Sequence, residues 1–441
     1  MNIRNLLLGS VAAAGLSTGA YAADLGVLTS LDVCDALGLS GLTISSDTNC
    51  LQITGEVKYK FTWGDYNLTA PADADVANEA DGDVNSLTWM RGSGDPDWAS
   101  RFDAWIKFVA TADSDFGPAK AVIKLKEVNH RTTTNGGAIA TGSSDTGGVV
   151  MDEAYVSIGD STVIMAGKKG SILNKGDDVP LNWLGLFISE KNDAGVTWGN
   201  SVDLPDGGHV IQVVSDLGNG FSVAGGLEAL NADNADTDTT GDFNDGKAGT
   251  AVGVIAYAGD GLSAHASFAA GGVLDGTIED WGVHAGFSGT FDNFKVVAAG
   301  AFGNDDDEGD YWNVLGSVSA TFDMFTIAGS VEANSNDQWG VGASASAAVT
   351  DGVTLNVGGR YLEESAGNDI YQVAASVVAA VTETITITGE VGYVDDDWAD
   401  LFYGSAKLAW APGGGFTSSV KGTVNSEDAY KIETEFKKTF E

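Results

Sequence analysis

The chain is strongly acidic, and its few basic residues recur at a spacing that can build one charged surface. It has 22 Lys and Arg against 62 Asp and Glu, which gives a formal net charge of −40. Within three early segments the basic residues share one parity: Lys58 and Lys60, Arg101 and Lys107, and Lys120, Lys124 and Lys126. Alternate residues of a β-strand point to the same face. Each set would therefore form a charged face, which can line water but cannot fill a dry core, because buried unpaired charge is costly.

The basic residues are also concentrated towards the two ends of the chain. Twelve lie between Lys58 and Lys175, five lie between Lys407 and Lys438, and the stretch between these clusters holds only Lys191, Lys247, Lys295 and Arg360. In a closed barrel the first and last strands are neighbours. The two clusters would then merge into one charged wall inside a pore.

An alternation of apolar and polar residues predicts the strands that carry these charges. From Leu51 to Trp63 the odd positions hold Leu, Ile, Gly, Val, Tyr, Phe and Trp, and the even positions hold Gln, Thr, Glu, Lys, Lys and Thr. This period of two indicates a long two-faced strand. Nine turn signals rich in Gly, Asp and Asn follow, at residues 113–117, 159–160, 218–219, 259–260, 292–293, 322–323, 351, 383 and 413–414. Nine hairpins plus one strand at each end predict 20 strands, and shifted boundaries would give 16 or 18.

The other ends of the strands carry longer polar connections, at residues 64–98, 129–148, 170–206 and 232–247. Short turns at one end and long polar loops at the other are typical of an outer-membrane barrel. A soluble β-sandwich rarely needs so many long two-faced strands. A calcium-binding β-helix would show tandem Gly-Gly-x-Gly-x-Asp repeats, which this sequence lacks. We therefore expect an all-β fold in which residues 51–441 form a transmembrane antiparallel β-barrel.

Residues 1–22 have the features of a secretory signal peptide. Arg4 supplies a positive charge, residues 6–16 supply a short apolar stretch, and Ala20-Tyr21-Ala22 supplies a cleavage pattern. The apolar stretch is shorter than the roughly 20 residues of a membrane-spanning helix. We expect the mature chain to begin at Ala23, with residues 23–50 as a separate segment before the barrel.

The two cysteines, Cys34 and Cys50, both fall in that segment. An exported protein encounters an oxidising compartment, so we expect them to form a disulfide. Closing a loop of this length would stabilise the fold by roughly 3 kcal/mol.

Two stretches of the sequence resemble the alphaproteobacterial porin family. One is Val33-Cys-Asp-Ala36 followed by Thr48-Asn-Cys-Leu-Gln-Ile-Thr-Gly-Glu-Val-Lys-Tyr59, and the other is residues 152–159 followed by Met165-Ala-Gly-Lys168. The resemblance implies a homotrimeric outer-membrane diffusion channel, typically of 16 strands, whose third loop folds into the lumen. It also implies an inward-facing Lys168. The chain ends Thr439-Phe440-Glu441, one residue past the terminal aromatic residue that is usual in such chains.

By this resemblance, residues 170–195 form a constriction loop. Its acidic residues are Asp177, Asp178, Glu190 and Asp193, and its expected wall anchors are Pro180, Trp183, Leu184 and Phe187. The basic residues expected to face it across the pore are Lys58, Lys60, Arg101, Lys107, Lys120, Lys124, Lys126 and Lys168. Facing rows of opposite charge create a transverse field that aligns polar solutes, whereas apolar solutes lose hydration without compensation. We expect passive diffusion of ions and small hydrophilic solutes, with a weak cation preference from the overall acidity.

Two acidic clusters in the expected external loops could bind Ca²⁺ or Mg²⁺, because hard cations prefer oxygen ligands. They are Asp305, Asp306 and Asp307, and Asp395, Asp396 and Asp397. Such ions could bridge the loops to lipopolysaccharide phosphates, although the charges could also only keep the loops soluble. We expect no other cofactor, outer-membrane lipids and lipopolysaccharide as neighbours, and no nucleic-acid partner for so acidic a chain.

Catalysis is not expected. The four histidines are His130, His209, His265 and His284, and none has a Ser or Cys partner in a recognisable nucleophile motif. Two alternatives to a general diffusion channel stay open: an outer-membrane barrel hydrolase and a solute-specific channel. Saturable, solute-blocked conductance would distinguish the solute-specific channel.

Overall fold

The computed structural model describes residues 31–66, 96–133, 139–141, 145–173, 179–188, 207–231, 249–274, 276–278, 280–305, 309–364, 369–396 and 399–441 of the 441-residue chain. These residues contain the short helix α2 (Leu31–Ala36) and 22 strands of a single sheet. No helix in this part of the chain is both long and apolar enough to cross a membrane. The expected signal peptide, residues 1–22, lies outside the described residues.

The strands follow one another along the chain as β1 (Thr43–Ser45), β2 (Cys50–Asp65), β3 (Asp97–Ala112), β4 (Ala119–Thr133), β5 (Ile139–Thr141), β6 (Val150–Gly159), β7 (Thr162–Lys169), β8 (Gly208–Gly218), β9 (Phe221–Glu228), β10 (Thr250–Gly259), β11 (Leu262–Ala270), β12 (Trp281–Phe291), β13 (Phe294–Asp305), β14 (Gly309–Phe322), β15 (Phe325–Asn334), β16 (Trp339–Thr350), β17 (Val353–Glu363), β18 (Asp369–Ala380), β19 (Ile385–Asp396), β20 (Ala399–Gly413), β21 (Phe416–Asn425) and β22 (Tyr430–Phe440).

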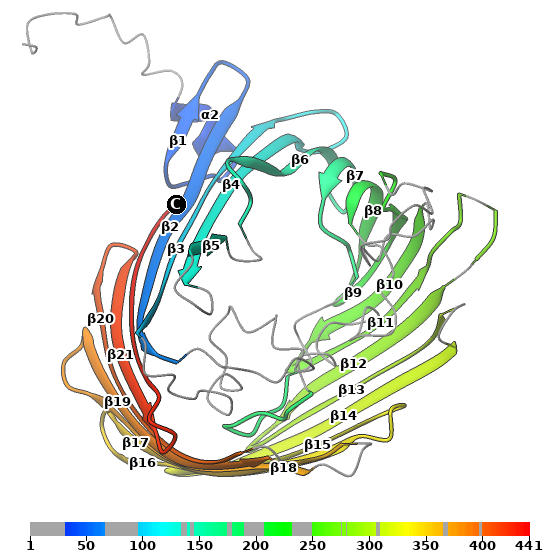
Figure 1. Cartoon of the computed structure of the whole chain (residues 1–441). Helices are drawn as coiled ribbons and strands as arrows, with labels where there is room; N and C mark the ends of the chain where they lie inside the picture. Colours follow the sequence, from blue (N-terminus) through cyan, green and yellow to red (C-terminus); the bar gives the residue numbers. More distant parts are fainter. Residues whose placement is uncertain are drawn as a thin grey trace, which may run out of the picture.

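The sheet closes into an antiparallel barrel because the first long strand pairs with the last (Figure 1). Their register runs from Gly55 opposite Phe440 to Asp65 opposite Tyr430. The short strands β1 and β5 pair only with β2 and β4, which leaves 20 of the 22 described strands in the barrel. The predicted all-β transmembrane barrel and its 20 strands are confirmed. The number 16 taken from the family resemblance is wrong for this chain, because all nine predicted hairpins form.

Several of the short turns lie one residue further along the chain than the sequence pattern predicts. Strand β8 ends at Gly218, so its turn is Asn219-Gly220, and the turn after β10 is Asp260-Gly261. Both residues of each turn have positive φ: 53° and 82° in the first, 51° and 78° in the second. Such turns match the twist of the strands they join, and Asn, Asp and Gly tolerate them best.

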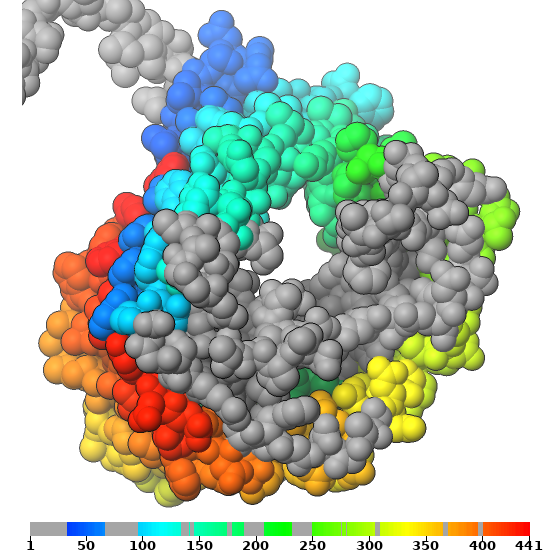
Figure 2. Space-filling model, in the orientation of Figure 1, coloured from blue at the N-terminus to red at the C-terminus, as the bar shows by residue number. Residues whose placement is uncertain are grey.

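The two faces of the barrel differ in polarity, as the alternation predicts. In β14, Trp312, Val314 and Val318 are exposed on one face, whereas Asn313 and Ser317 are buried on the other. The apolar face points outward, where it can contact lipid, and the polar face points to the interior. The space-filling view shows an opening through the barrel beside its cyan to green strands (Figure 2).

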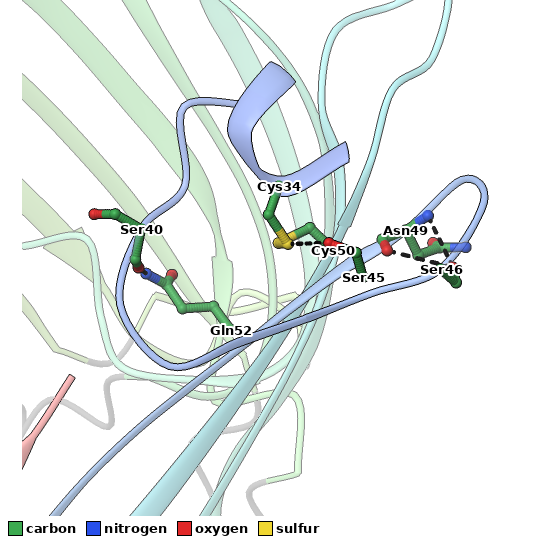
Figure 3. Close-up of a disulfide and its surroundings, with 7 residues drawn as sticks. All are labelled: Cys34, Ser40, Ser45, Ser46, Asn49, Cys50 and Gln52. Atoms are coloured by element: carbon green, nitrogen blue, oxygen red, sulfur yellow. Dashed lines mark hydrogen bonds between the residues drawn. A yellow bond between two sulfur atoms is a disulfide. The ribbon is translucent and has the colours of Figure 1, made fainter. Parts of the chain in front are cut away.

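Residues 31–50 form a small structure next to the N-terminal end of β2, outside the barrel wall (Figure 1). Strand β1 pairs with the start of β2, and a disulfide joins Cys34 of α2 to Cys50 of β2 (Figure 3). The Gln52 side chain adds a hydrogen bond of 3.0 Å to the Ser40 carbonyl. The predicted disulfide is confirmed.

Replacing both cysteines with serine is expected to destabilise residues 31–50 by about 3 kcal/mol and to leave the barrel intact. The pairing of β2 with β22 starts only at Gly55, beyond the disulfide. Hydrogen exchange in detergent micelles should become faster for the amides of residues 31–50 and stay unchanged in β2 beyond Gly55. Equal acceleration along the whole of β2 would show that the disulfide also supports barrel closure.

Candidate functional site: a charged wall and the loop across from it

Charged residues of β22, β2, β3 and β4 share one face of the barrel wall. Lys60 of β2 lies opposite Arg101 of β3 and Glu435 of β22. Lys107 of β3 lies opposite Lys124 of β4. The intervening side chains on these strands point the other way. The exposed large apolar residues among them are Val57, Tyr59, Trp63, Ile123, Ile432 and Phe436. The charged face therefore points into the barrel, and the two ends of the chain meet in it.

The charges of this face are arranged as ion pairs. We define the charged wall as the inward-facing charged residues of β22, β2, β3, β4 and β6. Its pairs, by nitrogen–oxygen distance, are Lys437–Glu56 at 3.4 Å, Lys60–Glu433 at 3.2 Å, Lys431–Glu433 at 3.6 Å, Lys58–Asp103 at 3.1 Å, Arg101–Asp103 at 3.0 Å, Lys107–Glu153 at 2.8 Å and Lys124–Asp152 at 2.6 Å. Five of the predicted basic residues, Lys58, Lys60, Arg101, Lys107 and Lys124, take part in these pairs, whereas their acidic partners are not among the predicted site residues. Partly exposed pairs contribute little stability each, so the wall's main property is its local field.

Three of the predicted basic residues differ from this pattern. Lys120 and Lys126 share the inward face of β4 but form no ion pair within the described residues. Lys168 lies on the opposite face, because the register aligns it with Ala154, which is on the same outward face of β6 as Val156. Its ammonium group is exposed and donates to the Met151 carbonyl at 2.7 Å. The prediction of an inward Lys168 is therefore wrong.

The neighbouring Lys169 takes the inward direction in place of Lys168. Its ammonium group lies 5.5 Å from the centre of the Tyr155 ring, and Tyr155 pairs with the inward-facing Val122 of β4.

Residues 170–173 and 179–188, which follow β7, contact the far wall of the barrel. Ile172 donates its backbone N–H to Glu228 of β9 at 2.9 Å. Farther along, Leu181 and Leu186 pack with Val297 and Leu315 of β13 and β14. This wall lies across the barrel from β3 and β4 in the strand order. We call residues 179–188 the docked loop.

Polar side chains of the far wall hold the backbone of the docked loop. Ser317 accepts a hydrogen bond from the Leu181 N–H, and Ser344 accepts one from the Trp183 N–H, both at 2.9 Å. Glu332 accepts from the Ile188 N–H at 3.0 Å. These three bonds come from β14, β16 and β15, so the loop bridges several strands.

Arg360 of β17 adds the most extensive contact to the docked loop. Its guanidinium donates to the Leu186 carbonyl at 3.1 Å and lies 4.0 Å from the centre of the Phe187 ring. A further bond of 2.8 Å joins it to Gln372, which donates to the Tyr403 hydroxyl at 2.7 Å. This chain of bonds fixes the orientation of Arg360.

A small residue in the wall allows the loop to approach closely. A Cβ atom at Gly342 would lie 2.6 Å from the Asn182 side-chain nitrogen and 3.1 Å from the Gly185 carbonyl oxygen. Of the expected anchors, Trp183 and Leu184 pack in a cluster with Ala374, Val394, Tyr403, Ala429 and Tyr66, and Phe187 stacks on Arg360. Pro180 is half-buried and has no such contact among the described residues.

The acidic residues predicted for the constriction, Asp177, Asp178, Glu190 and Asp193, lie outside the described residues. The same holds for Asp306, Asp307 and Asp397 of the predicted metal clusters and for the side chains of Asp305 and Asp396. The Asp395 carboxylate accepts hydrogen bonds from the Tyr371 and Tyr393 hydroxyls. Among the described residues there is no group of three or more His, Cys, Asp or Glu placed to hold a metal ion.

A model of the porin subfamily matches residues 30–412. The chain belongs to the porin subfamily. Among curated porins, Porin Omp2b of Brucella abortus is 28% identical over 318 residues, which cover 68% of this chain and 74% of that protein. Porin Omp2b of Brucella suis has the same identity and coverage.

Solved porin structures are also similar to the chain. The anion-selective porin from Comamonas acidovorans is 14% identical and covers 89% of this chain and 100% of its own, with a TM-score of 0.41. OccK3 of Pseudomonas aeruginosa is 8% identical and covers 88% of this chain and 96% of its own, with a TM-score of 0.45.

Membership of the subfamily confirms the predicted alphaproteobacterial porin family. The protein is therefore a diffusion channel of the bacterial outer membrane and not an enzyme. The alternative of an outer-membrane barrel hydrolase is excluded on this basis.

Proposed function

We propose that ions and small hydrophilic solutes pass between the charged wall and the docked loop, and that these two surfaces set the aperture and the charge selectivity of the porin. The observation that carries this proposal is the position of the docked loop, which is hydrogen-bonded to β14–β17 while the charged wall occupies β22–β6. This proposal includes the predicted pore-lining role of five basic residues: Lys58, Lys60, Arg101, Lys107 and Lys124. Because the protein as a whole is acidic, cations are weakly preferred.

The proposed assembly is a homotrimer in the outer membrane, as the family resemblance implies. Recording from purified protein in planar lipid bilayers tests assembly and selectivity together. Conductance should appear in triplets of equal steps, and reversal potentials in a KCl gradient should indicate a weak preference for K⁺. Single isolated steps would contradict the trimer, a clearly anion-selective reversal potential would contradict the proposed selectivity, and sealed bilayers would contradict the channel itself.

Glu433→Gln is expected to shift selectivity towards anions, because Glu433 is the shared carboxylate partner of Lys60 and Lys431. Its side chain is mostly buried in the wall, so removing its charge leaves two ammonium groups weakly compensated. The reversal potential in a KCl gradient should move in the anion direction. Glu427→Gln is the matched control: it removes the same charge from an exposed residue between β21 and β22, and it should leave the reversal potential unchanged. Equal potentials for the two variants would place Glu433 outside the ion path.

A further inference from the structure

Two lysines on the inner face of the barrel lie directly opposite each other, next to the charged wall. Lys407 of β20 is the register partner of Lys421 of β21. The exposed apolar residues next to them, Leu408 and Val420, point outward, so both lysines point inward. Directly opposed residues on antiparallel strands have Cβ atoms about 5 Å apart, and like charges at such positions repel each other. The fold therefore keeps two positive charges together in the lumen.

No acidic side chain around this pair forms an ion pair with it within the described residues. Glu433 lies opposite Lys421 and interacts with its charge, but its two carboxylate oxygens form ion pairs with Lys60 and Lys431. Glu390, near Lys407 on β19, accepts a hydrogen bond from the Tyr403 hydroxyl. Glu435 faces the same interior but forms no ion pair with either lysine. Lys107 and Lys124 are also directly opposed, but each of them has a carboxylate partner, whereas neither Lys407 nor Lys421 forms an ion pair within the described residues.

The surroundings of the pair also suit an oxygen-rich anion. Thr388 lies opposite Lys407, and Ser419 lies on the same face as Lys421, two residues away. Ammonium groups and hydroxyls are donors for phosphate and carboxylate oxygens. Lys407 is exposed and Lys421 is half-buried. Along the strands, both lysines lie closer to the short turn at Gly413–Gly415 than Tyr403 does. Tyr403 packs in the same cluster as Leu184 of the docked loop, so the lysines lie on the short-turn side of that loop.

We propose that Lys407 and Lys421 form a binding site for multivalent oxyanions, such as phosphate groups of small solutes, on the short-turn side of the docked loop. This inference rests on the proposed diffusion channel and adds a site to it. A solute that has passed the loop meets two ammonium groups at once. Binding there is local and does not require the channel to be anion-selective overall.

Block of single-channel current by inorganic pyrophosphate tests the site. In 0.1 M KCl the Debye length is about 10 Å, so the charges of the two lysines still act on an anion that reaches them. Pyrophosphate added on the short-turn side should therefore reduce the KCl current of the wild-type porin saturably. Lys407→Gln/Lys421→Gln should weaken the block at least tenfold, which corresponds to about 1.4 kcal/mol, because the variant loses both charge-assisted hydrogen bonds to the anion. Lys407→Arg/Lys421→Arg should retain it.

The matched control is Lys168→Gln/Lys438→Gln, which removes the same charge from residues on the outward face. Lys168 pairs with Ala154 on that face, and Lys438 has the same parity as Ile432 and Phe436. The control should be blocked like the wild type. Wild-type current that pyrophosphate does not reduce, or equal block of the two glutamine double variants, would overturn the site while leaving the channel function intact. Absence of KCl current without pyrophosphate would instead contradict the proposed function.

Discussion

Arg360→Ala is expected to raise the single-channel conductance and its noise, because the docked loop loses its most extensive wall contact. Arg360 is buried and bonds both the Leu186 carbonyl and Gln372. Its removal leaves these groups without their donor, and each buried unsatisfied polar group costs about 1–3 kcal/mol. Only the bond to Leu186 and the stacking on Phe187 involve the loop, so the docked state should lose about 1–3 kcal/mol relative to a detached loop. Recordings in planar bilayers would show the wider and less steady open level.

Two further variants make this test specific. Ser344→Ala removes a single hydrogen bond to the Trp183 N–H, so it should have a smaller effect of about 1 kcal/mol. Lys295→Ala removes a basic residue that is exposed near the turn between β12 and β13 and should behave like the wild type. If Arg360→Ala also records like the wild type, the docked loop does not determine the aperture.

Gly64→Val is expected to prevent closure of the barrel. A Cβ atom at Gly64 would lie 2.0 Å from the Tyr430 carbonyl oxygen and 2.9 Å from the Lys431 Cα atom. Both contacts are with the backbone of β22, which cannot move aside without losing its pairing with β2. Heat-dependent mobility in detergent gels should show no folded species for this variant. Gly422→Val in β21 is the matched control, because no atom lies within 4 Å of a Cβ built there. A folded Gly64→Val barrel would show that the seam tolerates a shifted register.

The barrel could be predicted from the sequence because each strand repeats one simple rule. Alternation of apolar and polar residues sets the faces, and Gly, Asp and Asn set the turns. Both signals are strong in Leu51–Trp63 and at Asn219-Gly220. The neighbouring positions of Lys60 and Glu435 then follow from closure alone. The family resemblance gave a different strand number because strand number is not fixed by the segments that carry the resemblance.

At Lys168 the alternation of apolar and polar residues is too weak to show which face of the strand points into the barrel. In β7 both faces carry apolar residues: Ile164 and Ala166 on one, Val163 and Met165 on the other. The preceding strand also shifts its register against β4 after Lys124, which changes the parity that a sequence count would assign. Only the observed pairing with Ala154 shows which way Lys168 points.

The wall contacts of the docked loop could not be predicted, because they join residues far apart in the chain. Ile188 and Glu332 are separated by 144 positions, and Leu186 and Arg360 by 174. One signal was present: Arg360 is a solitary basic residue between Lys295 and Lys407. An isolated charge within a two-faced strand indicates a specific partner, since burying it alone would be costly.

The pairing of β2 with β22 has a consequence for the order of folding. The Thr434 hydroxyl donates to the Phe61 carbonyl across 373 positions of sequence. Contacts this distant form late, and folding slows as such contacts come to dominate. Until the final strand has been exported, β2 presents eleven residues, Gly55–Asp65, without their partners, and an unpaired edge of that length is prone to aggregation. Until its last eleven-residue strand is available, the newly exported chain therefore exposes this edge of β2 to other chains.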